Sequence, residues 1–266
     1  MSGTWTWIET TRGARCRVLQ QGPEGSGNDV VYLHGMGGLD EDDPFLTRLA
    51  ERYRVHAPEL PGYGESTGEE LLEDMLDFTL HGWDVCDRLG LARPNLVGHS
   101  MGGMIAAEMA CVANDRPAKV ALLAPAGLWI DEHPVPDVFG MLPHHLPEVL
   151  FADPAKGLAS MTRGSDFTDQ QALLDFFIGN AKRLGTAGKI LFPIPNRRLS
   201  KRLYRLTAET LLVWGEADKL MPPSAYAARW QELVPQASLV TVPDAGHMVP
   251  VEQPEAVGDA VEKFLG

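Results

Sequence analysis

Short apolar runs recur along the chain, and most of them are followed by a turn and then by a helical pattern. The continuous apolar run at 29–33 is typical of a strand that is buried on both faces of a parallel sheet. Similar patterns predict further strands at 5–8, 15–19, 53–57, 95–97, 118–124, 210–214 and 238–242. Strands that alternate with helices predict an α/β fold with a mostly parallel central sheet flanked by helices.

The helices between these strands are predicted from apolar residues at spacings of three and four. From 69 to 89 this spacing indicates an amphipathic helix packed on the sheet, and Gly90 ends it. Further helices are expected at 44–52, 104–113, 223–233 and 254–265. Pro254 suits the first turn of the last one, where a backbone N–H is not needed.

The alternation of strands and helices breaks between about 127 and 206. Five prolines lie close together in this stretch, and helical patterns reappear only at 169–181 and 199–206. We therefore predict that 127–207 is a helical cap, or lid, inserted after the sixth strand. Residues 1–126 and 208–266 are then the core domain that contains the sheet.

One strand-to-helix turn carries a chemical motif, Gly98-His99-Ser100-Met101-Gly102. A serine in such a turn is held in a strained backbone conformation with its hydroxyl pushed out of the sheet. The following helix directs its free N–H groups at the same place. The motif is short, so a glycine-rich turn with a capping serine remains an alternative at this point.

Composition excludes some classes of function. The chain has 23 basic and 36 acidic residues, a formal charge of −13, which disfavours nucleic acid and anionic membranes as partners. Its three cysteines are far apart and suggest neither a disulfide framework nor a zinc site. His144 and His145 lack partners at ligand spacing, so we expect no metal and no cofactor. Reduced thiols and the lack of a signal-peptide pattern favour a cytoplasmic location.

Four elements together resemble the α/β-hydrolase fold superfamily, in its serine-nucleophile branch of esterases and C–C bond hydrolases with a cap domain. These are His34-Gly35 after a strand, the motif at Ser100, Asp218 after the next-to-last predicted strand, and His247 after the last. The order Ser, Asp, His is the order of that family. The resemblance covers nearly the whole chain except the cap.

The resemblance implies a catalytic triad. Ser100 is expected to be the nucleophile, His247 the general base, and Asp218 the acid that orients the imidazole. The backbone N–H groups of Met36 and Met101 are expected to form the oxyanion hole. Asp131 is an alternative triad acid, whereas Asp244 fits a turn better.

Substrate-binding residues are predicted near the triad and in the cap. His34, Gly35 and Met248 flank the expected site, and several methionines there suit an adaptable apolar wall. The cap stretch 176–208 contains no Asp or Glu but eight basic residues. Arg197 or Arg198 is expected to hold a substrate carboxylate if it faces the cleft. The alternative is a solvated face, or a surface that pairs with the acidic core.

The function expected from these residues is a carboxylesterase that acts on small to medium acyl or aryl esters without a cofactor. A C–C bond hydrolase of ring-cleavage products is a first alternative, although such relatives often carry Asn at the position of His99 and Trp shortly after the catalytic His. Thioesterase, lactonase and perhydrolase activity remain open, as does a slow-turnover ligand receptor on the same fold. The expected partner is a small-molecule ester, and a homodimer is left open.

Overall fold

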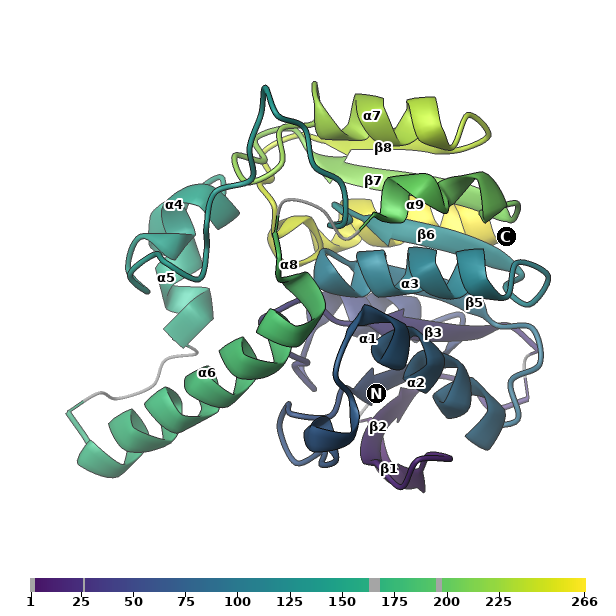
Figure 1. Cartoon of the computed structure of the whole chain (residues 1–266), viewed down its shortest axis with the longest axis horizontal. Helices are drawn as coiled ribbons and strands as arrows, with labels where there is room; N and C mark the ends of the chain where they lie inside the picture. The colour runs from purple at the N-terminus through teal and green to yellow at the C-terminus, as the bar shows by residue number, and fades with distance from the viewer. Residues whose placement is uncertain (1–2, 26, 163–167, 195–197) are drawn as a thin grey trace.

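A single eight-stranded sheet forms the centre of the protein. The computed structural model describes residues 3–25, 27–162, 168–194 and 198–266. The strands lie in the order β1-β2-β4-β3-β5-β6-β7-β8 (Figure 1). Their bounds are β1 Thr4–Glu9, β2 Arg15–Gln21, β3 Asp29–Leu33, β4 Arg54–Glu59, β5 Asn95–His99, β6 Lys119–Leu123, β7 Glu209–Gly215 and β8 Ser238–Val242. Neighbouring strands are parallel from β4 to β8 in this order. Strand β2 is antiparallel to both of its neighbours, β1 and β4.

The register of the central strands brings their carboxyl ends to one edge of the sheet. Gly98 on β5 lies opposite Leu33 on β3 and opposite Leu122 on β6. On the far side of β6, Leu123 lies opposite Val213 on β7. Loops that follow these strands therefore meet at the same edge, where parallel α/β sheets bind their ligands.

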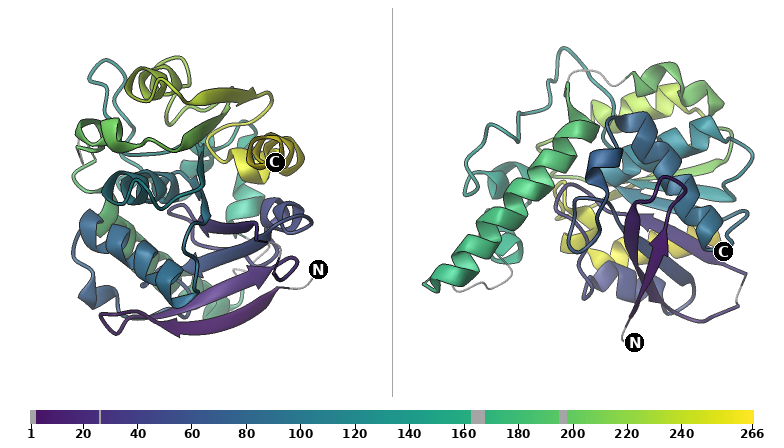
Figure 2. Two further views of the ribbon diagram at one scale, coloured as in Figure 1. Left: turned by 90° about the vertical axis from the view of Figure 1, so that its right-hand side faces the viewer. Right: turned by 60° about the horizontal axis from the view of Figure 1, so that its bottom comes forward.

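Helices cover both faces of the sheet (Figure 2). One hydrophobic core includes α2 (Met75–Arg88), α3 (Met101–Val112) and α7 (Tyr226–Leu233). The opposite core includes α1 (Pro44–Leu49), α8 (Val249–Glu252) and α9 (Pro254–Leu265). Burial of strand residues from both sides explains why the central strands are continuous apolar runs rather than alternating ones.

The segment 127–207, which we call the cap, lies between β6 and β7. Its α-helices are α4 (Leu146–Leu150), α5 (Pro154–Thr162) and α6 (Gln170–Leu191), and its described residues contribute no strand. Figure 1 shows α4 and α5 beside the sheet edge, with α6 running diagonally away from the core.

The observed helices differ from the sequence predictions by a few residues at several ends, and larger differences lie at 69–75, 181–191 and 199–206. The helix expected from 69 starts only at Met75, because the Asp74 side chain caps it by accepting hydrogen bonds from two backbone N–H groups. The helix predicted to end near 181 continues to Leu191. The stretch 199–206 forms two 3₁₀ turns, Leu199–Lys201 and Leu203–Arg205, rather than an α-helix.

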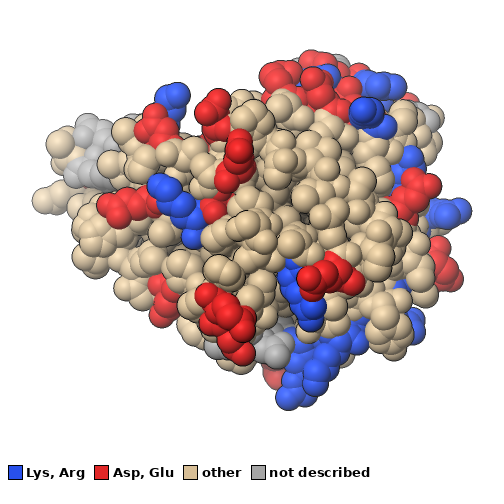
Figure 3. Space-filling model, turned by 90° about the horizontal axis from the view of Figure 1, so that it is seen from above, with Lys and Arg blue, Asp and Glu red and all other residues tan. Residues whose placement is uncertain are grey.

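Charged side chains are interspersed on the surface, with broad uncharged areas between them, as the view in Figure 3 shows. Within the described residues, every helix is too short or too polar to cross a membrane.

Gly102 should be essential to the fold. A Cβ at Gly102 would lie 2.0 Å from the carbonyl oxygen of Leu33, so α3 could not keep its close contact with the end of β3. We expect Gly102→Ala to lower the free energy of unfolding by about 3 kcal/mol, as overpacking does. Gly179→Ala is the matched control, because a Cβ there meets no atom of the described residues within 4 Å. Urea denaturation of both variants measures the difference, and equal stabilities would contradict the packing argument.

His81 on α2 should make stability depend on pH. Among the residues that the structure describes, neither of its ring nitrogens has a hydrogen-bond partner, and burial lowers its pKa from 6.5 to about 4. The unfolded chain therefore binds a proton near pH 6.5 that the folded chain does not, so stability is present above that pH and falls below it. Lowering the pH from 7.5 to 5.5 should lower the free energy of unfolding by about 1 kcal/mol through His81. The variant His81→Leu should lose that part of the pH dependence. Urea denaturation at both pH values measures it, and an unchanged slope in the variant would count against His81.

Candidate active site

Ser100 occupies a strained turn between β5 and α3. Its φ of 52° and ψ of −113° lie outside the regions that a serine usually adopts. The turn is clamped on both sides, because the Ser100 N–H donates to the Leu123 carbonyl (2.9 Å) and the Ser100 carbonyl accepts from Ala126 (3.0 Å). A Cβ on Gly98 would lie 2.4 Å from the Gly102 carbonyl oxygen, so only glycine fits there. The motif thus forms the strained strand-to-helix turn, or elbow, that its sequence predicts.

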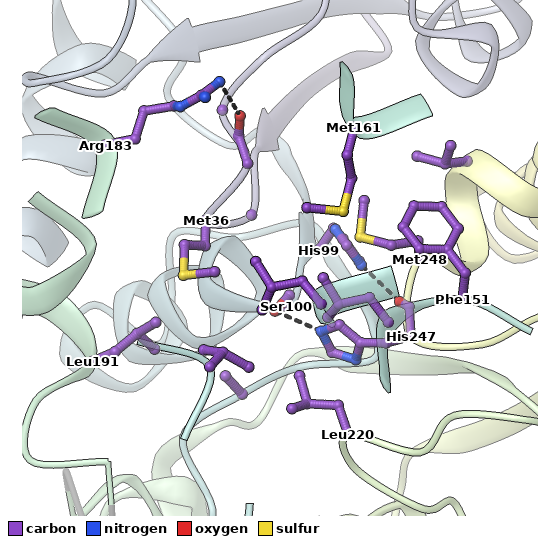
Figure 4. Close-up of a pocket in the computed structure, with 18 of the residues that line it drawn as sticks. Met36, His99, Ser100, Phe151, Met161, Arg183, Leu191, Leu220, His247 and Met248 are labelled. Atoms are coloured by element: carbon purple, nitrogen blue, oxygen red, sulfur yellow. Dashed lines mark hydrogen bonds between the residues drawn. The ribbon is translucent and has the colours of Figure 1, made fainter. Parts of the chain in front are cut away.

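Ser100, His247 and Asp218 form one chain of hydrogen bonds. The Ser100 Oγ lies 2.8 Å from His247 Nε2, and His247 Nδ1 lies 2.9 Å from Asp218 Oδ2 (Figure 4 shows the first contact). Asp218 and His247 are both buried. Since Nδ1 donates to the carboxylate, Nε2 is left to accept the serine proton. The three residues come from the carboxyl ends of β5, β7 and β8, which the sheet brings together.

The Asp218 carboxylate is held by two further donors. Trp214 Nε1 donates to its Oδ2 (3.1 Å), and the Met221 N–H donates to its Oδ1 (2.8 Å). These bonds set the direction of the carboxylate. The two alternative acids lie elsewhere: Asp131 accepts from Trp129 Nε1, and Asp244 sits in a turn with a φ of 54°.

His99 contacts the backbone of His247. Its Nε2 donates to the carbonyl oxygen of His247 at 2.9 Å. Burial, and next the neighbouring His247, lower the pKa of His99 to about 3, so its ring stays neutral. His99 is therefore suited to position His247 rather than to act as a base.

The loop after β3 lies beside Ser100 and is held by a histidine. His34 Nδ1 donates to the Gly35 carbonyl (2.8 Å), and His34 Nε2 accepts from the Leu60 N–H (3.2 Å). Both ring nitrogens are thus occupied by backbone groups, and burial lowers the His34 pKa. His34 does not line the pocket, so its predicted contact with substrate has no support in the geometry. Its side chain instead shapes the loop that carries Met36.

Ser100 and His247 open into a largely apolar pocket of about 460 Å³. Gly35, Met36 and Met248 line it. In Figure 4, Met36 and Leu191 lie on one side of Ser100, and Met161 and Met248 on the other. The cap supplies much of the remaining apolar wall, including Leu128, Val138, Phe139, Leu146, Leu150, Phe151, Met161, Phe176 and Leu184.

The cap arginine that lines this pocket is one that sequence reasoning did not single out. Arg183 on α6 lies at the pocket wall and donates to the Gly37 carbonyl oxygen at 3.4 Å (Figure 4). Arg197 lies outside the described residues. Arg198 is exposed and does not line the pocket, so carboxylate binding by it stays a prediction without geometric support.

Other basic residues of the cap bind the core. Lys189 donates to the carbonyls of Glu69 and Leu72, Arg202 pairs with Glu108, and Arg205 donates to the Cys111 carbonyl. These contacts match the alternative in which the basic stretch pairs with the core. The Lys189 contacts arise because the C-terminal end of α6 lies over the segment after β4, whereas Arg202 and Arg205 follow α6 and reach α3. No local pattern signals either contact.

Within the described residues, no group of three His, Cys, Asp or Glu side chains is arranged to hold a metal ion. Cys16, Cys86 and Cys111 are free and buried. Burial raises the pKa of each thiol to about 12, which makes them poor nucleophiles.

With this geometry in view, comparison with known proteins identifies the family. A model of the alpha/beta hydrolase fold matches residues 29–254. The chain belongs to the alpha/beta hydrolase fold family. This confirms the fold class that the sequence predicted.

The proteins that this chain resembles carry names that denote different activities. The chain is 31% identical to the dihydrolipoyllysine-residue acetyltransferase component of the acetoin cleaving system of Cupriavidus necator, over 96% of this chain and 67% of that protein. It is 29% identical to a pimeloyl-[acyl-carrier protein] methyl ester esterase of Pectobacterium atrosepticum, over 91% of this chain and 96% of that protein. The structure is also similar to that of a bacterial membrane phospholipase A, with a TM-score of 0.78 and 25% identity over 99% of this chain and 86% of that one.

Proposed function

We propose that this hydrolase cleaves carboxylic esters of small to medium acyl or aryl substrates through an acyl-enzyme on Ser100. The observation that carries the proposal is the hydrogen-bonded chain from Ser100 through His247 to Asp218 at an apolar pocket. A serine hydroxyl is a poor nucleophile by itself, and this arrangement supplies the base it needs.

In the proposed mechanism, His247 Nε2 takes the proton of Ser100 as Oγ attacks the ester carbonyl carbon. Negative charge then develops on the carbonyl oxygen, and the backbone N–H groups of Met101 and Met36 would receive it. Met101 is the first residue of α3, so its N–H has no acceptor within the helix. His247 then gives the proton to the leaving alcohol. Water releases the acid from Ser100 by the same steps, with His247 again as base.

The volume and lining of the pocket indicate a small to medium substrate with an apolar part. Its volume of about 460 Å³ is at the lower end of the range for small-molecule sites, and aliphatic and thioether side chains dominate its wall. An acyl chain or an aromatic ring would bury apolar surface against this wall. The ester carbonyl itself must reach Ser100.

Ester hydrolysis is favoured over C–C bond hydrolysis by one feature of the motif. It has His99 beside the nucleophile, and the His99 Nε2 is engaged with the His247 backbone. Thioester, lactone and perhydrolase chemistry would use the same three side chains, and the choice among them rests on the pocket.

A substrate panel tests the proposal. Purified protein is assayed with p-nitrophenyl acetate, butyrate and octanoate, an acyl thioester, a lactone and a vinylogous diketone. We expect the highest kcat/KM on an ester, with a p-nitrophenol burst that the Ser100→Ala variant lacks. Turnover of the diketone above all esters would favour the C–C hydrolase instead. Stoichiometric binding of an ester without turnover would favour a receptor and overturn the proposal.

A further inference from the structure

Helix α6 is held by the core along only one half of its length. Near its C-terminal end, Thr186, Ala187 and Ile190 are buried, and Lys189 donates to carbonyl oxygens of the core. The N-terminal half projects beyond the core, as Figures 1 and 2 both show. The helix therefore has a long outer face that its own core does not cover.

This outer face carries a continuous uncharged stripe. Its members are spaced four, three, four and three residues apart, which keeps them on one side of a helix. They are Leu174, Ile178, Ala181, Gly185 and Gly188, and we call them the outer stripe. Leu174 is 52% exposed and Ile178 is 58% exposed. Large apolar side chains this exposed on successive turns mark a contact surface.

No close packing contact within the described chain requires glycine at the two glycine positions of the outer stripe. A Cβ on Gly185 would meet nothing within 4 Å, and one on Gly188 would come only to 3.7 Å of the Phe192 side chain. Each glycine in a helix interior costs about 1 kcal/mol relative to alanine. Bare backbone at these positions instead leaves room for side chains of another molecule.

We propose that α6 is the contact surface of a homodimer, in which the outer stripes of two copies pack antiparallel about a twofold axis at Ala181. In this arrangement Leu174 of one copy lies over Gly188 of the other, and Ile178 lies over Gly185. Large side chains then fill the space that the glycines leave open, as close packing requires. A parallel pair would set glycine against glycine and leave gaps.

The position of α6 and its lack of charge on this face agree with the proposal. Phe176 and Arg183 line the pocket, and Ile190 is buried against the core, all from the opposite face of the helix. Two copies joined by their outer stripes would therefore point their cores away from each other. Because each copy carries a formal charge of −13, an uncharged stripe is where two copies can approach with least repulsion. A twofold contact of one patch with itself is the commonest form of dimer.

The size of the contact sets its expected strength. The 22 residues of α6 span about 33 Å, so the helix pair buries less than the roughly 800 Å² per partner of a stable complex. We therefore expect a dimer with a dissociation constant in the micromolar range. A lipid surface is a poorer occupant, since the glycine half of the stripe offers it no apolar side chain.

Disulfide cross-linking tests whether the proposed twofold axis passes at Ala181. The native cysteines are buried, so an introduced surface cysteine is the reactive one. Under mild oxidation we expect Ala181→Cys to form covalent dimers at least tenfold faster than Leu80→Cys, a control at an exposed position on α2. Equal rates for the two variants would overturn the proposal.

The orientation and the native equilibrium are tested separately. A mixture of Leu174→Cys and Gly188→Cys should cross-link faster than either variant alone, whereas faster self-linking of Leu174→Cys would indicate a parallel pair and contradict the proposal. In sedimentation equilibrium from 1 to 100 µM, the native protein should dimerise and Ile178→Glu should stay monomeric with an unchanged melting temperature. A native protein that stays monomeric throughout, or that co-sediments with phosphatidylcholine vesicles through this stripe instead, would overturn it.

Discussion

Ser100→Ala should lower kcat on p-nitrophenyl butyrate by about 10⁴- to 10⁶-fold while the protein remains folded. The side chain caps no backbone N–H of α3, so its loss removes the proposed nucleophile without removing a structural bond. The backbone of the turn should keep its conformation in the variant, because backbone hydrogen bonds with Leu123 and Ala126 hold it. Steady-state kinetics and the absence of a p-nitrophenol burst measure the effect.

Ser160→Ala is the matched control for this variant. Ser160 lines the same pocket but belongs to α5 of the cap. We expect its loss to change kcat by less than about tenfold, because Ser160 is not part of the hydrogen-bonded chain of Ser100, His247 and Asp218. If both variants keep native turnover, a nucleophile other than Ser100 acts and the proposed mechanism is wrong.

Asp218→Asn should lower kcat by about 10⁴-fold with little change in KM. The carboxylate accepts the Nδ1 proton of His247 and two further hydrogen bonds, from Trp214 and Met221. An amide has nearly the same shape, but its NH₂ can donate to Nδ1 and so favour the tautomer with the proton on Nε2. In that tautomer His247 cannot accept the proton of Ser100. Kinetics of the folded variant on the same ester measure the loss.

Asp131→Asn is the control for the acid, since Asp131 was the alternative candidate from the sequence. Its carboxylate accepts a hydrogen bond from its neighbour Trp129 and contributes nothing to the His247 contacts described above. We expect its kcat within about twofold of the native value. A large loss in Asp131→Asn together with a small loss in Asp218→Asn would reverse the assignment of the acid.

Parts of the site that depend on short local patterns could be predicted from the sequence. The turn at Ser100 needs glycine on either side because side chains there would collide with backbone, and that need is visible in the motif itself. Asp218 and His247 lie in turns that follow apolar runs, so their places just after two strands could also be predicted. The last strand and the last helix were predicted with their observed bounds, 238–242 and 254–265.

Other roles depend on contacts between residues far apart in the chain. Both nitrogens of His34 are occupied by backbone, and His99 holds the His247 carbonyl, 148 residues away. The continuation of α6 to Leu191 follows from its contacts with the segment after β4, since its glycines weaken the helical signal. The same contacts bring Arg183, rather than Arg198, to the pocket wall.

The sequence by itself determined the sheet, the elbow at Ser100 and the order of serine, aspartate and histidine, because periodicity, glycine and strand ends are properties of short segments. Only the tertiary structure decided which acid meets His247, which histidines are structural and which cap arginine reaches the pocket. The physical reason is that strand order and helix packing set distances between residues that no local pattern relates.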